Sequence, residues 1–285
     1  MIIFIEHGRL GNQIFQYVAL RSYASDGKLI LVGFDELKEV FCNIDARFVL
    51  SNKSFIFKLL KRFRNRVNKI FKHIPFFATI DVSCSNEGIY LYEKKGLVNK
   101  LKYAFTNFYQ SEGLMGQKTI NNICIDQKIK NNAIKILNSF SANQQLVFIH
   151  IRRGDYLSWP SSDFPAVLPL SWYTKCMDKT YEYYENPFFV VASDDFYYAY
   201  DVFSDRNDVY ITAADKETDF ALMALCQGGI LSASSFAWWA ACFAKDKNPN
   251  GRFLAPLYWA GHRKGEWHPP HIKSSFLEYV EVDSM

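Results

Sequence analysis

Short, almost wholly apolar runs separated by helical stretches are the feature that most constrains how this chain folds. Residues 2–5, 28–34 and 147–151 are such runs. Strands this apolar are covered on both faces, as in parallel sheets. Between the first two runs, residues 13–24 place apolar side chains at helical spacing. Strand, helix, strand predicts a βαβ unit and a parallel sheet at the start of the chain.

The same rhythm returns in the second half of the chain. The run at 147–151 is followed by helical patterns at 171–184 and 219–226, by the apolar segment PFFVVA, and by a helix that begins at SASS. The fold class is therefore α/β, with two Rossmann-like domains facing a cleft. We expect an N-terminal domain over residues 1–145 and a C-terminal domain over residues 146–285.

Composition sets limits on the class of protein. The chain has 285 residues, of which 49% are hydrophobic, and this is enough for two packed cores. No apolar run reaches the roughly 18–20 residues of a membrane helix, and the N-terminus lacks the basic region of a signal peptide. We therefore expect a soluble, cytoplasmic protein. Six cysteines without a CxxC pair predict buried, reduced thiols.

The positive charge is concentrated in one segment. Residues 46–80 hold nine Lys and Arg and no acidic residue, so the rest of the chain is net negative. Residues 55–74 form an amphipathic helical pattern with a basic side. Such a surface docks on anionic membrane, or is simply a solvated face of a packed helix. Interleaved aromatic residues also suit nucleic acid, but that leaves the motifs below unexplained, so we expect no nucleic-acid partner.

Four motifs place polar groups after a strand or at a helix start, where open α/β sheets bind ligands. The first is HGRLGNQ, residues 7–13. Its glycines let a ligand approach the backbone, and Asn12 suits a helix N-cap. It lacks the spacing of a dinucleotide or P-loop motif. A plain tight turn is the alternative to a cleft loop formed by Arg9, Gly11, Asn12 and Gln13.

The second motif, HIRRGDY, crowds charges around a glycine at the end of a predicted strand. The guanidinium of Arg152 fits phosphate oxygens with two parallel hydrogen bonds. Asp155 either pairs with Arg153, accepts a proton during a reaction, or does both in different states. A purely structural Arg–Asp pair at a strand end is the alternative.

The third and fourth motifs follow two other apolar segments. In FVVASDD, Asp194 and Asp195 either hold ribose hydroxyls or cap a helix. They lack the DxD spacing with which two carboxylates hold a metal and a diphosphate, and no cluster has the ligand spacing of a metal site. In SASSFAWWAA, the hydroxyls of Ser234 and Ser235 form an anion site with the first free amides, or an ordinary cap. Trp238 and Trp239 are predicted in the core.

Together these groups suit a nucleotide diphosphate held without a metal ion, with fixed positive charge stabilising the leaving group. GRLGNQIFQY, HIRRGDY, FVVASDD and SASSFAWWAA, in this order, resemble glycosyltransferase family 11, the α-1,2-fucosyltransferases. The resemblance implies a GT-B-like fold and no metal or other cofactor. It also implies inverting transfer of L-fucose from GDP-β-L-fucose to the 2-OH of a terminal galactose.

The resemblance also assigns roles to residues. Arg152 holds the β-phosphate, and Asp155 is the first candidate for the general base, ahead of Glu6, His7 and Asp163. The other residues implied to bind the donor are His150 and Asp219 around the guanine, Ser234, Ser235 and Phe236 at the diphosphate, and Arg153, Asp194 and Asp195 nearby. Arg9 departs from the pattern, since many bacterial members have a glycine there.

The partners expected from the resemblance are GDP-fucose and a galactose-terminated oligosaccharide, free or lipid-linked, such as an O-antigen or other surface glycan. The enzyme then acts in the cytoplasm, peripherally at the inner face of the membrane through residues 55–74. A fucosyltransferase with a different acceptor or linkage is the alternative.

Overall fold

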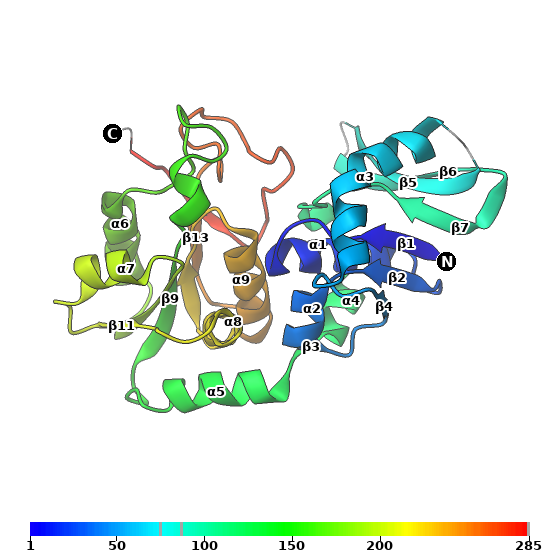
Figure 1. Ribbon diagram of the computed structural model, residues 1–285. Helices are drawn as coiled ribbons and strands as arrows, with labels where there is room; N and C mark the ends of the chain where they lie inside the picture. The colour runs from blue at the N-terminus through cyan, green and yellow to red at the C-terminus, as the bar shows by residue number, and fades with distance from the viewer. Residues whose placement is uncertain (74–75, 86–87, 284–285) are drawn as a thin grey trace. The chain divides into compact units, whose positions relative to one another are not determined.

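The computed structural model describes residues 1–73, 76–85 and 88–283 (Figure 1). The chain divides into two compact units, unit 1 (Met1–Asp126) and unit 2 (Gln127–Met285). The sequence placed this boundary later, between residues 145 and 146. The difference is the helix α5 (Gln127–Leu137), which packs against α8 (Lys216–Leu225) and so belongs with unit 2.

Unit 1 is built on a six-stranded sheet in the order β4-β2-β1-β7-β5-β6. Neighbouring strands are parallel except for β5 and β6, which run antiparallel. A separate antiparallel pair joins β3 to β8. The strands are β1 (Ile2–Ile5), β2 (Leu29–Val32), β3 (Phe41–Cys42), β4 (Arg47–Val49), β5 (Phe77–Ser85), β6 (Gly88–Lys94), β7 (Val98–Ala104) and β8 (Cys124–Ile125).

The helices of unit 1 confirm the predicted βαβ start. Helix α1 connects β1 to β2, and its residues are almost all buried. Helix α3 packs through Phe57 and Phe71 onto a cluster that includes Val32 and Tyr103. The helices are α1 (Leu10–Tyr23), α2 (Asp35–Val40), α3 (Phe55–His73) and α4 (Gln117–Asn122), with the 3-10 turn η1 (Glu112–Leu114). Residue 74, the last of the predicted basic helix, lies outside the described residues.

Unit 2 contains a six-stranded, fully parallel sheet in the order β11-β10-β9-β12-β13-β14. Counted along the chain, this is the order 3-2-1-4-5-6 of a Rossmann fold, and the order reverses between β9 and β12. The strands are β9 (Gln145–Ile151), β10 (Pro187–Ser193), β11 (Val209–Ile211), β12 (Gly228–Ile230), β13 (Phe253–Pro256) and β14 (Glu278–Val280).

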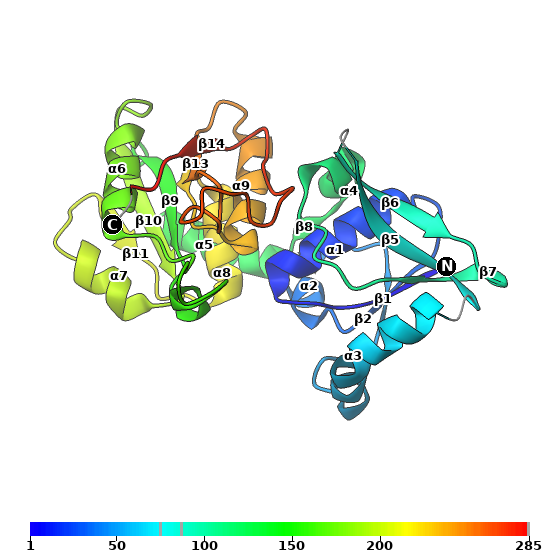
Figure 2. The ribbon, with the colours of Figure 1, turned by 90° about the horizontal axis from the view of Figure 1, so that it is seen from above.

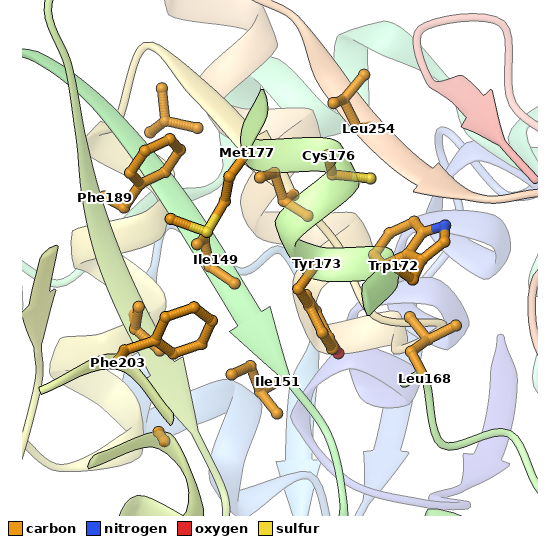
Figure 3. Packing of buried hydrophobic residues seen from close by; sticks show 14 of the residues in the cluster. Ile149, Ile151, Leu168, Trp172, Tyr173, Cys176, Met177, Phe189, Phe203 and Leu254 are labelled. Atoms are coloured by element: carbon orange, nitrogen blue, oxygen red, sulfur yellow. The ribbon is translucent and has the colours of Figure 1, made fainter. Parts of the chain in front are cut away.

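The core of unit 2 forms where α6 packs on this sheet. Figure 3 shows Ile149 and Ile151 of β9 beside Trp172, Tyr173 and Met177 of α6. Trp238 and Trp239 are buried, as predicted. The helices are α5, α6 (Leu170–Thr180), α7 (Phe196–Phe203), α8 and α9 (Ser235–Lys247), with the 3-10 turn η2 (Gly154–Leu157).

Two expectations about details were wrong. The helix predicted over 171–184 ends at Thr180, and a turn follows. All six cysteines are free, as predicted, but only Cys176 and Cys226 are fully buried, while Cys42 and Cys124 are exposed opposite each other on β3 and β8. Among the described residues, we find no helix with the length and hydropathy needed to cross a membrane.

Removing a core side chain tests the packing of unit 2. Met177→Ala should lower the free energy of unfolding by about 2–5 kcal/mol, because it leaves a cavity between α6 and the sheet. Urea denaturation followed by tryptophan fluorescence measures the change. Tyr197→Ala is the control, since that ring on α7 is 85% exposed. Equal stability of the two variants would contradict the packing.

Candidate active site

The carboxyl ends of β9 and β12 meet at the point where the strand order of unit 2 reverses. The two strands pair in register, with Ile149 opposite Ile230, and the amide of Ser232 donates to the carbonyl of His150 over 3.1 Å. Beyond this point β9 leads into η2, and β12 leads into α9. Parallel sheets bind ligands at such a switch point. The structure thus brings the second and fourth motifs together.

Arg152 lies at the centre of this group. Its guanidinium forms an ion pair with Asp194 over 3.0 Å and another with Asp155, and it lies over the ring of Tyr156. The Arg152 side chain is 16% exposed, whereas that of Asp155 is 58% exposed. Arg152 is therefore held in place at the strand end by two carboxylates, of which that of Asp194 is largely buried and that of Asp155 is exposed to solvent.

Gly154 is required by this arrangement. A Cβ atom at this position would lie 2.6 Å from Oδ2 of Asp194, the oxygen that pairs with Arg152. Gly154 therefore lets the carboxylate of Asp194 come close enough to pair with Arg152.

Arg153 has different partners from those predicted. Its Nε donates to Asp195 over 3.2 Å, its guanidinium stacks 3.7 Å from the ring centroid of Tyr198, and its amide donates to Asp194. The predicted pairing of Arg153 with Asp155 is wrong, because the guanidinium of Arg153 lies over α7. Asp195 also caps α7 by accepting from the amide of Tyr198.

His150 lies inside unit 2. Its Nδ1 is 2.7 Å from Oγ of Ser232, and its ring lies 5.7 Å from that of Phe236. Burial, and then the charge of Arg152, lowers the pKa of His150 to about 3. The imidazole is therefore neutral near pH 7, and it ties the end of β9 to the loop before α9.

The serines of the fourth motif begin α9. Ser234 is the N-cap, and its hydroxyl accepts from the amide of Phe236 over 3.3 Å. Ser235 is the first helical residue and is half-buried. Tyr156 braces this turn from the other side, since its hydroxyl donates to the carbonyl of Ala233. The capping alternative thus holds for Ser234.

Asp219 lies on α8. Its Oδ1 accepts from the hydroxyl of Thr212 over 2.9 Å, and the next residue, Phe220, contacts Phe236 with ring centroids 5.2 Å apart. Burial raises the pKa of Asp219 to about 7, although the Thr212 hydrogen bond opposes this. The end of α8 that carries Asp219 thus adjoins the start of α9.

The first motif adopts a different conformation from the predicted loop. Helix α1 begins at Leu10 with Arg9 as the N-cap, so Asn12 is not the cap. Gln13 is buried inside unit 1, where it donates to Glu6 over 2.6 Å and accepts from the amide of Leu37. Gly11 is also a buried helical residue. Arg9 is exposed and Asn12 half-buried.

The strand order of unit 1 also reverses, between β1 and β7. There His7 stacks on Phe108 with ring centroids 4.3 Å apart, and Arg64 of α3 donates to the carbonyl of Glu6 over 3.3 Å. Burial, then Arg64 and Lys61, lower the pKa of His7 to about 4. Glu6 is buried and accepts from Gln13 and from the amide of Phe34.

Sequence reasoning missed an aromatic row beside Arg152. Tyr156 lies 5.0 Å from Trp159, and Trp159 lies 5.5 Å from His268, measured between ring centroids. Trp159 is 38% exposed. A signal was present, because the loop after HIRRGDY is rich in aromatic residues, but its contact with residue 268 depends on the tertiary fold.

A Rossmann-ordered sheet with an arginine and a helix start at its switch point suits the binding of a nucleotide and its phosphates. The model of glycosyl transferase family 11 matches residues 3–250. The chain therefore belongs to glycosyltransferase family 11, and it is a glycosyltransferase of the fucosyltransferase type.

Comparisons with individual proteins support this family assignment. The chain is 30% identical to an alpha-1,2-colitosyltransferase of Escherichia coli, over 88% of this chain and 90% of that protein. It is 26% identical to the O-antigen biosynthesis glycosyltransferase WbnK of Escherichia coli, over 82% and 87% of the two chains. The structure of POFUT1 in complex with GDP-fucose superposes with a TM-score of 0.54 at 13% identity, covering 88% and 97%. That likeness confirms the predicted GT-B-like fold.

Adding one methyl group at Gly154 tests the geometry around Arg152. Gly154→Ala should lower the rate of glycosyl transfer by about 10²-fold, because it pushes Asp194 off the guanidinium. Nucleotide release measures the rate, and circular dichroism checks the fold. Gly113→Ala is the control, since its added Cβ meets nothing closer than 3.7 Å. A Gly154→Ala enzyme as fast as this control would contradict the arrangement.

Proposed function

We propose that this enzyme transfers L-fucose from GDP-β-L-fucose to the 2-OH of a terminal β-galactoside, with inversion and without a metal ion. The product carries an α-1,2 linkage on an O-antigen or other surface glycan. The observation that carries the proposal is Arg152, held at the switch point of unit 2 beside the start of α9. A diphosphate there meets a guanidinium and the free amides of a helix N-terminus.

Charge balance determines how the donor enters. Two guanidinium groups, of Arg152 and Arg153, face the three carboxylates of Asp155, Asp194 and Asp195. The cluster thus carries one net negative charge before the donor binds, so a diphosphate has to replace a carboxylate at Arg152. Asp155 is the one replaced, because it is exposed and makes one contact with Arg152. Asp194 is held by Arg152 and by the amide of Arg153.

The displaced carboxylate is well suited to act as the base. Once displaced, Asp155 has a carboxylate that no longer pairs with Arg152 and is free to accept a proton. It takes the proton from the acceptor 2-OH as that oxygen bonds to the anomeric carbon. The bond to GDP breaks at the same time, through a transition state like an oxocarbenium ion. Its electron pair goes to the diphosphate oxygen, which Arg152 and the α9 amides stabilise.

Metal-independent transfer is part of the proposal. Fixed positive charge from Arg152 takes the place of a cation at the leaving diphosphate. Asp194 and Asp195 support this, since their carboxylates are engaged by Arg152 and Arg153. Transfer in the presence of EDTA tests the point.

The remaining residues of the site have proposed roles around the nucleotide. Asp219 and Phe236 border the guanine, since α8 and α9 meet there through Phe220. His150 acts through its contacts with Ser232 and Phe236, which it orients. Ser234 and Ser235 present the amides of the α9 start to the diphosphate.

The acceptor sugar is proposed to lie against Trp159, an exposed residue that follows η2. Trp159 contacts Tyr156, and Tyr156 in turn lies under the guanidinium of Arg152. Aromatic faces offer a large apolar contact for a sugar ring. A galactose-terminated oligosaccharide, free or lipid-linked, is then the substrate, and the reaction takes place at the cytoplasmic face of the membrane. This agrees with a relative named for O-antigen biosynthesis.

The relative that is 30% identical is named an alpha-1,2-colitosyltransferase. GDP-colitose is therefore the second candidate donor, with the same site and the same linkage.

A donor and acceptor screen tests the proposed function. GDP-fucose and GDP-colitose are each incubated in EDTA with lactose, with the N-acetylated type 1 and type 2 disaccharides, and with free galactose. We expect fucose at the 2-OH of a terminal galactose, identified by NMR of the product, and no product from Arg152→Ala. Preference for GDP-colitose would change the donor, another linkage would contradict the acceptor position, and a requirement for added metal would contradict the metal-free mechanism.

Asp155→Asn separates binding from chemistry. The amide is a weaker competitor for Arg152, so the affinity for GDP, measured by calorimetry, should rise or stay unchanged. Turnover should fall by about 10²–10⁴-fold, because the general base is lost. Asp195→Asn, which leaves Arg152 and its two carboxylates in place, is the matched control for turnover. A loss of only a few-fold in the Asp155 variant would show that Asp155 is not the base.

A further inference from the structure

Helix α3 has one face packed and one face uncovered. Phe57, Leu60, Val67 and Phe71 recur at helical spacing and pack on the sheet of unit 1. Arg64 and Lys61 approach Glu6 at the end of β1. In Figure 2, the strands of unit 1 lie on one side of α3 only. The rest of the helix surface, which comprises one flank of the packed face and the side opposite it, is therefore available for contact with another surface.

The uncovered face carries an apolar stripe. Ile56, Leu59, Phe63 and Ile70 follow the spacing of three and four residues that places side chains on one line along a helix. Ile56 is 56%, Leu59 45% and Ile70 55% exposed, and Phe55 at the helix start is 78% exposed. Single exposed apolar residues are ordinary, but a row of them along one helix indicates an interaction surface.

A basic stripe runs directly beside the apolar one. Lys58, Arg62, Arg66 and Lys69 are exposed and recur at the same helical spacing, and Arg66 lies over the ring of Phe63 at 5.2 Å. The sequence has no acidic residue between residues 46 and 80, so no carboxylate within this segment offsets the charge. The outward face of α3 is thus cationic and apolar at once.

We propose that the outward face of α3 binds the surface of a bilayer containing anionic lipids. The bilayer interface offers phosphate groups to the basic stripe and acyl chains to the apolar stripe, and amphipathic helices lie in its plane with this division. A nucleic acid would satisfy only the cations and leave Ile56, Leu59 and Ile70 in water. Docking deepens the proposed function, because it keeps the enzyme where lipid-linked acceptors are found.

The test uses the full-length enzyme and vesicles, with neither donor nor acceptor present, so its result does not depend on the proposed function. Binding by co-sedimentation is compared for vesicles of phosphatidylcholine alone and for vesicles with added phosphatidylglycerol. We expect binding only to the anionic vesicles, weakening as salt is raised. Lys58→Gln/Arg62→Gln/Lys69→Gln should weaken it by about 100-fold, at roughly fivefold per cation. Ile56→Ser/Leu59→Ser/Ile70→Ser should also weaken it, through loss of the apolar contact.

A matched control replaces three exposed lysines of the same unit outside α3, Lys94→Gln/Lys95→Gln/Lys100→Gln, and should bind vesicles like the unchanged enzyme. All three variants should transfer sugar to a soluble disaccharide at the unchanged rate, and circular dichroism confirms their fold. The proposal would be overturned if the enzyme bound neutral vesicles equally well, or if the control variant weakened binding as much as the α3 variants. It would also be overturned if both α3 variants bound like the unchanged enzyme, or if the enzyme bound single-stranded oligonucleotides but not anionic vesicles.

Discussion

The carboxylate of Asp194 joins the two strand ends on which the site of unit 2 depends. One of its oxygens pairs with the guanidinium of Arg152 over 3.0 Å, and the other accepts from the amide of Arg153 over 2.8 Å. Asp194 follows β10 and Arg152 follows β9, and these strands are paired in register up to their last residues. The sheet therefore delivers both groups to the same edge. Gly154 leaves the space that the carboxylate occupies.

This arrangement keeps a positive charge at the switch point without leaving it unpaired. An isolated guanidinium held at a partly buried position costs free energy, and a carboxylate partner offsets that cost. Two partners offset it further, and one of them, Asp155, is exposed enough to be replaced. In the proposed mechanism, the donor diphosphate competes with Asp155 for Arg152, and this exchange leaves a carboxylate beside the reacting sugar.

Strands β1, β2, β9 and β10 and the polar groups that follow β9 and β10 could be predicted, because uninterrupted apolar runs and the residues after them are local patterns. Strand β14 was missed, since EYV is short and partly polar and is fixed only by its neighbour β13. The predicted start of α1 was two to three residues too late. The helix begins at Leu10 because its amide donates over 2.5 Å to Glu36, a residue distant in sequence. Arg152 meets Asp155 because the 3-10 turn η2, which contains Asp155, begins directly after the strand end that carries Arg152. The pairing of Arg153 with Asp195 depends on the position of α7, which no local pattern contains.

A crystal structure of the enzyme with GDP bound in the presence of EDTA would show directly how the diphosphate is held. We expect the β-phosphate against the guanidinium of Arg152 and the first amides of α9. We also expect that Asp155 has turned away from Arg152 while Asp194 keeps its contacts. GDP bound away from the β9–β12 switch point, or bound there with the Arg152–Asp155 pair intact, would contradict this expectation.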